Sequence, residues 1–156
     1  MIELTHGDLL AAPAEALVNA VNTVGVMGKG IALQFRKTYP DMFFAYEKAC
    51  KEGAVRVGQM NVFDRGESHQ HARWIINFPT KRHWREPSRL VDIESGLADL
   101  SAVIRRVQIH SVAIPPLGCG LGGLEWTVVQ PLIESAMANL VNVKILIYSP
   151  NNPTRS

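Results

Sequence analysis

Short apolar runs alternate along the chain with longer stretches in which apolar residues recur every three or four positions. Short runs rich in aliphatic residues and bounded by polar residues or glycine are typical of buried β-strands. Such runs are MIEL, EALVNAV, MNVF, RWIINF, SVAIP and VKILIY, at residues 1–4, 15–21, 60–63, 73–78, 111–115 and 143–148. We expect these segments to form the strands of one sheet.

The stretches with helical spacing lie between these strands. In the clearest one apolar residues are three and four positions apart, and Ser88 is a candidate N-terminal cap for it. Its apolar positions are Leu90, Ile93, Leu97, Leu100, Ile104 and Val107. A second helix is expected through Phe35, ending before Pro40. A third is expected to start near Asp41 and to stop at Gly53.

A fourth helix is predicted after Trp126. Thr127 and Gln130 have the spacing of a capping box, and Pro131 then falls in or near the first turn. The order is therefore strand, strand, helix, helix, strand, strand, helix, strand, helix, strand. This order predicts an α/β layered domain with a mixed sheet at residues 1–150, followed by a polar C-terminal tail at residues 151–156.

Composition and charge fit a globular domain and permit an anionic ligand. Of the 156 residues, 47% are hydrophobic and 19% are charged, and the net charge is +2. Cys50, Cys119 and the histidines lack metal-ligand spacing, so we expect neither a disulfide framework nor a bound metal. The N-terminus lacks a signal-peptide pattern and no apolar run reaches transmembrane length. We therefore expect a cytoplasmic protein without a cofactor or a membrane partner.

Two glycine-rich segments each follow a predicted strand and precede a predicted helix. They are NTVGVMGKGIALQF at residues 22–35 and PPLGCGLGGLEW at residues 115–126. Glycine lets the backbone approach a ligand closely, and free N–H groups at a helix N-terminus bind anions. Neither the Walker loop nor the dinucleotide-binding motif is present. The pair indicates two loops that close on one diphosphate, although each alone is also consistent with glycines that serve tight turns.

Four motifs in this order resemble the macrodomain family, and the resemblance covers nearly the whole chain. They are GDLL, NAVN, GVMGKGIA and PPLGCGLGGLEW. Macrodomains bind ADP-ribose, and the resemblance implies a three-layer α/β/α sandwich around a central mixed sheet. The segment NFPTKRHWREP at residues 77–87 is similar to the DarG subclass, the antitoxin enzymes that remove ADP-ribose from thymidine in DNA.

The resemblance therefore implies a hydrolase, a DNA ADP-ribosyl glycohydrolase that reverses the action of the DarT toxin. Its partners would be ADP-ribose, ADP-ribosylated single-stranded DNA and DarT, the last through a region absent from this chain. Three alternatives stay open at this point. The chain is alternatively a reader that binds ADP-ribose without hydrolysis, a glycohydrolase acting on ADP-ribosylated protein, or a phosphatase acting on phosphorylated ADP-ribose.

The resemblance also assigns ligand contacts to particular residues. Asp8 would accept a hydrogen bond from the adenine amino group, with the Leu9 amide beside it, although Asp8 is equally suited to cap a helix. Asn22 would hold the hydroxyls of the distal ribose, whereas we expect Asn19 to be a turn residue. The residues expected to line the diphosphate and the distal ribose are Gly25, Val26, Met27, Gly28, Gly30, Ile31, Pro116, Gly118, Cys119, Gly120, Leu121 and Gly122.

Lys81 would be the catalytic residue, with Asn22 at the same end of the ligand. It would act as a cation on the thymine carbonyl or, with a lowered pKa, as an amine that attacks the sugar. Burial or the neighbouring Arg82 would lower that pKa. In a glutamate-directed relative an acidic residue follows the GCGL pattern and takes part in catalysis. Gly122 occupies that place here, so the proton donor stays unassigned.

The run from Lys81 to Arg85 interleaves cations with an aromatic residue. Arg82, Trp84 and Arg85 are candidates for contact with DNA, although such a run is also typical of a solvated surface. His83 is expected to be structural or to face solvent. Elsewhere, we expect Cys119, which lies between the glycines of GCGL, to be a small apolar residue and not a nucleophile. The aromatic side chains of Phe43, Phe44 and Trp126 are expected in the core.

Overall fold

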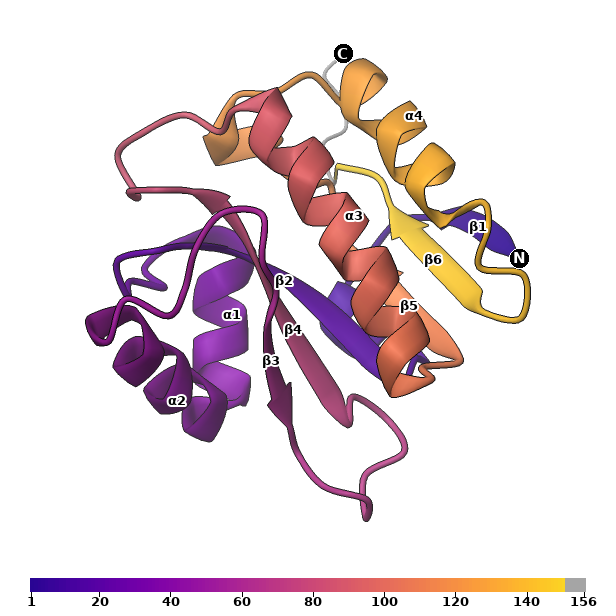
Figure 1. The fold of residues 1–156 in the computed structure, drawn as a ribbon, viewed down its shortest axis with the longest axis horizontal. Coiled ribbons are helices and arrows are strands. Elements are labelled where there is room, and N and C mark those ends of the chain that lie inside the picture. The colour runs from indigo at the N-terminus through magenta and orange to yellow at the C-terminus, as the bar shows by residue number, and fades with distance from the viewer. Residues whose placement is uncertain (151–156) are drawn as a thin grey trace.

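The computed structural model describes residues 1–150, and its elements follow the predicted order (Figure 1). The predicted tail at residues 151–156 lies outside the described residues. The elements are β1 (Ile2–Thr5), η1 (Leu9–Ala11), β2 (Ala16–Asn22), α1 (Gly30–Thr38), α2 (Pro40–Lys51), β3 (Asn61–Asp64), β4 (Trp74–Lys81), α3 (Leu90–Val107), β5 (Ser111–Ile114), η2 (Gly120–Gly122), α4 (Trp126–Met137) and β6 (Lys144–Tyr148). The two η elements are short 3-10 helices.

The sheet is mixed, as predicted. Its strand order is β1-β6-β5-β2-β4-β3, and all neighbours are parallel except β3, which runs antiparallel to β4. From β2 the chain proceeds to β4 on one side, and after α3 it returns to β5 on the other side of β2. The strand order therefore reverses between β2 and β5, which is the position where open α/β sheets bind ligands.

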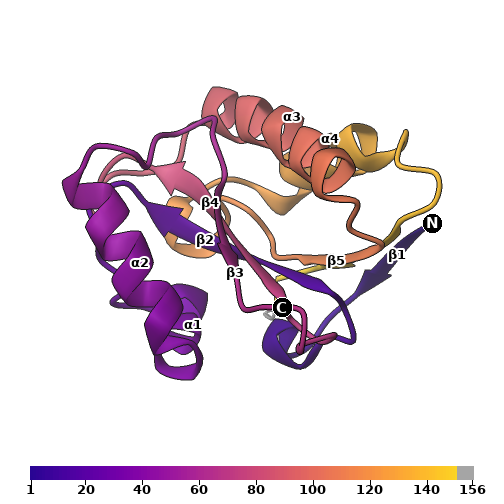
Figure 2. The same ribbon diagram turned by 60° about the horizontal axis from the view of Figure 1, so that its bottom comes forward.

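Helices cover both faces of the sheet, so the expected three-layer sandwich is confirmed (Figure 2). α3 and α4 pack on one face, whereas α1, α2 and η1 pack on the other. Along β2, Ala16 and Val18 belong to the core under α3 and α4, and Leu17 belongs to the opposite core. This alternation buries the strand on both faces, which is why its sequence reads as a continuous apolar run.

α3 packs closely on β4 because a glycine faces the strand. A Cβ atom on Gly96 would come within 2.4 Å of the ring of Phe78, so any larger residue would push the helix away. The predicted span of this helix from its apolar spacing, Leu90 to Val107, is the observed one. The close contact fixes α3 against the strand that ends at Lys81.

Both predicted helix caps are wrong. The residue at the N-cap of α3 is Arg89, while Ser88 instead donates its main-chain N–H to the carbonyl of Gly122, 2.9 Å away. α4 already begins at Trp126 and its N-cap is Glu125, so the Thr127 capping box does not form. Pro131 accordingly lies inside α4.

Among the aromatic residues expected in the core, Phe44 is also a wrong prediction, because it is 63% exposed on α2. Its neighbour Phe43 is buried, and Trp126 is partly buried against the core. α2 is amphipathic, so two adjacent aromatic residues cannot both face the sheet.

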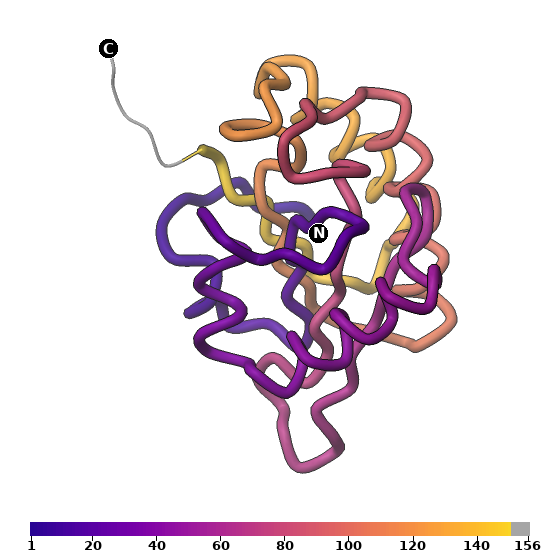
Figure 3. The backbone as a smooth tube through the Cα atoms, turned by 90° about the vertical axis from the view of Figure 1, so that its left-hand side faces the viewer, coloured from indigo at the N-terminus to yellow at the C-terminus, as the bar shows by residue number. Residues whose placement is uncertain are grey.

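The carboxyl ends of the parallel strands all lie along one edge of the sheet. The connection between β3 and β4, residues 65–73, projects at the opposite edge, as the backbone tube shows (Figure 3). Within residues 1–150 none of the helices has the length and apolar character needed to cross a bilayer.

Candidate functional site

The two glycine loops meet above the centre of the sheet. The first glycine loop, residues 22–30, follows β2, and the second glycine loop, residues 115–125, follows the adjacent strand β5. A Cβ atom on Gly30 would lie 3.7 Å from Cδ1 of Leu121, so the loops are in van der Waals reach of each other. Both loops therefore border one site at the edge where the strand order reverses.

Asn22 shapes the first glycine loop from within. Its Nδ2 donates to the carbonyl of Val26 at 2.8 Å, and its Oδ1 accepts from the N–H groups of Val24 at 3.0 Å and Val26 at 3.4 Å. The side chain is almost fully buried. One Nδ2 hydrogen of Asn22 already bonds Val26, so a single N–H of this amide is left to donate to the distal ribose. The contact between Asn22 and the ribose stays a prediction.

Tyr46 on α2 holds this asparagine, and the sequence reasoning missed it. The hydroxyl lies 2.7 Å from the carbonyl oxygen of Asn22 and 2.9 Å from its Oδ1. Burial and the neighbouring Cys50 raise the pKa of Tyr46, so the hydroxyl stays protonated and donates. The available signal was helical spacing, since Tyr46 shares the buried face with Met42 and a buried tyrosine hydroxyl needs a partner.

The expectation that Asn19 is a turn residue is wrong. Asn19 is fully buried in the middle of β2, where its Nδ2 donates to Oδ1 of Asn77 at 3.1 Å. Asn77 in turn donates to Oδ1 of Asn61 at 3.0 Å. The three residues occupy matching positions on adjacent strands, so they form a row of amides across β2, β4 and β3. Because the neighbouring strands place hydrogen-bonding side chains in this row, a polar residue can be buried in the core.

The N-terminus of α1 faces the site. Gly30, its first residue, has φ of +58°, a conformation that favours glycine. The N-cap residue Lys29 makes no side-chain hydrogen bond to the first turn, so N–H groups of that turn are free of a side-chain cap. The Met27 side chain is fully buried and anchors the loop in the core. The Met27 side chain is therefore not available for contact with a ligand.

In the second glycine loop, close packing accounts for two of the glycines. A Cβ atom on Gly118 would come within 2.6 Å of Leu124, and one on Gly122 within 2.4 Å of the Ser88 hydroxyl oxygen. Gly120, by contrast, is exposed, and a Cβ atom added there would meet nothing within 4 Å. Glycine thus serves tight packing at the base of this loop and leaves open space at its tip.

Lys81 lies at the end of β4, directly opposite Asn22, after an irregularity in the strand register. Bulges next to functional sites often redirect a side chain. Its Nζ lies 3.4 Å from the carbonyl oxygens of both Leu121 and Trp84, so the amine sits between the second glycine loop and its own loop. Burial lowers the pKa of Lys81. Of the two causes considered for this shift, burial is therefore the one that acts.

Asp8 is exposed and caps η1, since its Oδ1 accepts from the N–H of Leu10 at 3.0 Å. Its carboxylate also lies near Tyr148, where burial and, to a lesser extent, Asp8 raise the pKa of the phenol. The side chain of Leu9 is buried, which leaves its main chain for any ligand contact. The capping interpretation of Asp8 is thus confirmed, while the adenine contact stays a prediction.

One cation of the basic run after β4 is held in an ion pair, although its side chain is 44% exposed. The guanidinium of Arg82 forms two hydrogen bonds to the buried carboxylate of Asp92, at 2.9 and 3.2 Å. Trp84 is 44% exposed, and the Arg85 guanidinium lies 4.6 Å from its ring centre. His83 accepts a hydrogen bond from the Arg85 main chain, which is a structural role. Among the described residues Arg85 forms no ion pair, so Trp84 and Arg85 stay candidates for contact with DNA.

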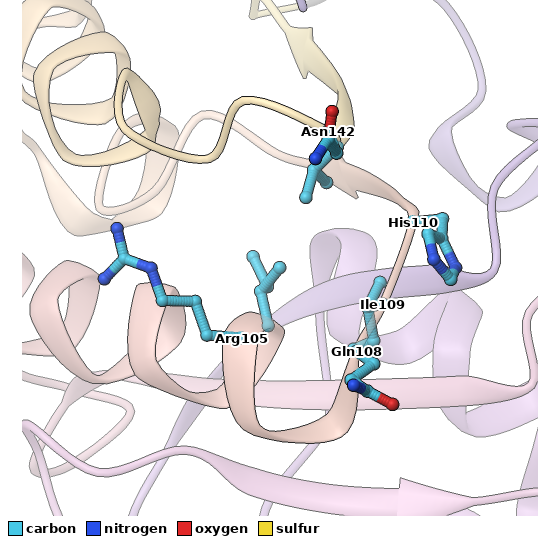
Figure 4. A pocket seen from close by; sticks show the side chains of 7 residues that line it. Arg105, Gln108, Ile109, His110 and Asn142 are labelled. Carbon is cyan, nitrogen blue, oxygen red and sulfur yellow. The ribbon is translucent and has the colours of Figure 1, made fainter.

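Cys119 does not resemble a nucleophile, because burial and the nearby Glu125 raise the pKa of its thiol to about 11. Among residues 1–150 no cluster of His, Cys, Asp and Glu side chains is arranged to hold a metal ion. A hollow of about 380 Å³ lies between the end of α3 and the start of β5 and β6 (Figure 4). It is lined by residues that include Arg105 and His110. It lies at the edge of the sheet opposite the carboxyl ends of the parallel strands and is separate from the site of the glycine loops.

Comparisons with known proteins support this arrangement. Residues 18–133 match the family described as the Macro domain. A DNA ADP-ribosyl glycohydrolase of Mycobacterium tuberculosis is 56% identical over 156 residues, covering 100% of this chain and 44% of that protein. The chain thus spans less than half the length of this relative.

Two solved structures have the same fold at substantial identity. One is described as the macrodomain of Mycobacterium tuberculosis DarG, with a TM-score of 0.94 and 57% identity over 97% of this chain and 99% of that chain. The other is described as Thermosipho africanus DarTG in complex with ADP-ribose, with a TM-score of 0.91 and 36% identity over 99% of this chain and 43% of that chain.

Proposed function

Because the chain belongs to the macrodomain family, we propose that it binds ADP-ribose between its two glycine loops and hydrolyses the bond that joins ADP-ribose to thymidine in single-stranded DNA. The carrying observation is the meeting of both loops and Lys81 at one point. Leu121 lies beside Gly30, and its carbonyl lies 3.4 Å from the Lys81 amine. The mycobacterial relative named above, a DNA ADP-ribosyl glycohydrolase, supports the same reaction.

In this proposal the diphosphate lies at the N-terminus of α1, with the tip of the second glycine loop on its other side. The uncapped first turn supplies N–H donors, and the helix dipole favours the negative charge there. Asp8 follows β1 at the same carboxyl-terminal edge of the sheet, and there it binds the adenine amino group. Asn22 contributes its remaining amide N–H to the distal ribose, which brings the reacting bond to Lys81.

The lowered pKa of Lys81 favours the neutral amine as the nucleophile. Its nitrogen forms a bond to the anomeric carbon while the bond from that carbon to the thymine ring nitrogen breaks. The lysine nitrogen loses a proton as it becomes bonded to the sugar, and this proton passes to the thymine nitrogen. The sugar ring then opens to a Schiff base, and water releases ADP-ribose and restores the amine. Trapping with borohydride tests this route, because the cation route leaves no reducible adduct on Lys81.

The site favours DNA over glutamate-linked ADP-ribose because it lacks room for a further carboxylate. Any side chain at Gly122 would meet Ser88, so the acid that the glutamate-directed relative uses has no place here. In the described residues no acidic side chain forms an ion pair with Lys81. The reaction therefore depends on the amine and on the bound diphosphate.

The proposal is tested with Lys81→Ala against ADP-ribosylated oligonucleotide, ADP-ribosylated protein and phosphorylated ADP-ribose. We expect the unaltered chain to release ADP-ribose from the oligonucleotide only, and the variant to lose turnover while calorimetry shows ADP-ribose binding largely intact. Lys144→Ala removes an exposed lysine on β6 and serves as the matched control. Full turnover by Lys81→Ala would remove this residue from the mechanism, and binding without release by the unaltered chain would make it a reader.

We further propose that Trp84 and Arg85 hold the DNA strand and that the protein acts in the cytoplasm as the antitoxin of a DarT toxin. Each cation that pairs with a phosphate of a single strand contributes about 0.7 to the slope of log affinity against log salt. Arg85→Ala should therefore reduce the salt dependence of oligonucleotide binding. Co-expression with a DarT enzyme tests the antitoxin role, and DNA that stays modified in those cells would contradict it.

A further inference from the structure

The ion pair between Arg82 and Asp92 offers a different role for a residue that the sequence assigned to DNA. The guanidinium makes two hydrogen bonds to the carboxylate, at 2.9 and 3.2 Å, in the side-by-side geometry that arginine favours. Asp92 lies in the first turn of α3 and is 5% exposed. A buried carboxylate without its cation is costly, so Asp92 holds the guanidinium in place even though the Arg82 side chain is 44% exposed.

Arg82 is also held through its main chain. Its carbonyl oxygen accepts a hydrogen bond of 2.7 Å from the hydroxyl of Thr23, which belongs to the first glycine loop. One residue is therefore tied to the first glycine loop by its backbone and to α3 by its side chain. It directly follows Lys81, the residue at the centre of the site.

These ties determine where the Lys81 amine lies. One of its two acceptors is the carbonyl of Trp84, which belongs to the loop that starts at Arg82. Both contacts of the amine are 3.4 Å long, so they are too weak to hold it alone. The loop that carries Trp84 must instead be fixed by stronger bonds, and the shortest of these is the one from Thr23 to the Arg82 carbonyl, at 2.7 Å.

We infer that Arg82 is a positioning residue for Lys81, held between Asp92 on α3 and Thr23 in the first glycine loop, and not a contact to the DNA strand. The inference rests on the proposed function, since it concerns the turnover that Lys81 performs. It predicts that the two ends of the ion pair behave as one unit in catalysis. It also predicts that the oligonucleotide binds equally well without the pair.

The test compares Arg82→Lys, Asp92→Asn and the double variant. Arg82→Lys keeps the charge but cannot form the two parallel bonds. We expect kcat for release from ADP-ribosylated oligonucleotide to fall by about tenfold or more in each single variant, with no further loss in the double variant. KM, the salt dependence of strand binding and the affinity for ADP-ribose should change by less than about twofold.

Arg73→Lys is the matched control, because Arg73 forms an equivalent two-bond pair with Asp64 far from the site, at 2.9 and 3.1 Å. It should leave kcat unchanged. Thr23→Val tests the other tie without disturbing the buried carboxylate, and its kcat should fall in the same direction, so the inference stays testable even where an Asp92 variant unfolds.

Unchanged kcat in Arg82→Lys and Thr23→Val would overturn the inference. An effect confined to KM, with a lower salt slope, would return Arg82 to the DNA strand. If the unaltered chain releases no ADP-ribose from the oligonucleotide, the proposed function itself fails, and the inference with it. An active unaltered chain with fully active variants refutes the positioning role alone.

Discussion

The hydroxyl of Tyr46 lies 2.7 Å from the carbonyl oxygen of Asn22 and 2.9 Å from its side-chain oxygen. This contact joins α2 to the first glycine loop at the residue that organises that loop. Asn22 in turn holds the main chain of Val24 and Val26. The conformation of the first glycine loop thus depends on a buried hydroxyl on α2.

Tyr46→Phe should loosen the first glycine loop, because it removes the hydroxyl and keeps the ring. We expect ADP-ribose affinity to fall by about five- to tenfold and the free energy of unfolding to fall by about 1 to 2 kcal/mol. Calorimetry and denaturant titration measure the two effects. Tyr39→Phe is the control, since that ring is partly exposed and packs on Phe35 away from the loop. Equal ADP-ribose affinity in both variants would contradict the role of Tyr46.

Much of the fold could be predicted because its signals are local. The apolar spacing that ends at Val107 gave the bounds of α3, and the short apolar runs gave the strands in their order. The helix-cap predictions were wrong because the contacts that decide them are not local. Ser88 looks like a cap in sequence, but its main chain is bound to Gly122, which lies far along the chain. Rules based on neighbouring residues cannot predict a partner that is so distant in the sequence.

The site shows the same division. The glycine loops and Lys81 were recognisable from motifs, whereas Tyr46 and Asp92 were not, because their partners are distant in sequence. Arg82 was a candidate for contact with DNA because of the composition of its segment and its position directly after a strand. Its partner Asp92 is ten residues away, across the turn into α3, where charge patterning gives no information about pairing.

Asp8 has two roles that a pair of substitutions separates. Asp8→Ala removes both the cap of η1 and the carboxylate proposed for adenine, whereas Asp8→Ser keeps a good cap but is too short to reach the base. We expect both variants to lose ADP-ribose affinity by about tenfold or more. Calorimetry with ADP-ribose measures this. Full recovery in Asp8→Ser would show that the cap alone matters and would refute the adenine contact.

The charged form of Lys81 should lower the stability of the folded protein. Burial lowers its pKa below the ordinary 10.5, so the folded state binds fewer protons than the unfolded chain between those two values. Stability therefore rises with pH through that window. Lys81→Met should raise the melting temperature at neutral pH, and the advantage should vanish above about pH 10.5. Thermal unfolding across this range, with Lys144→Met as the exposed control, tests the sign; a destabilised Lys81→Met would contradict it.

Gly122 and Ser88 should be coupled by steric contact. A Cβ atom at Gly122 would come within 2.4 Å of the Ser88 oxygen and 3.1 Å of its Cβ, so Gly122→Ala should displace the second glycine loop. We expect ADP-ribose affinity to fall by about tenfold or more, since we propose that this loop contacts the diphosphate. The Ser88 hydroxyl has no hydrogen-bond partner among the described residues, so its removal loses no such bond.

The coupling predicts a graded rescue. In the Gly122→Ala background, Ser88→Ala removes the nearer atom and should recover part of the affinity, and Ser88→Gly removes both atoms and should recover more. The same Ser88 substitutions alone should change ADP-ribose affinity by less than about twofold. Purely additive losses across the series would show that Gly122 is needed for a reason other than its contact with Ser88. In that case the absence of an acidic residue at this position would need a chemical explanation in place of a steric one.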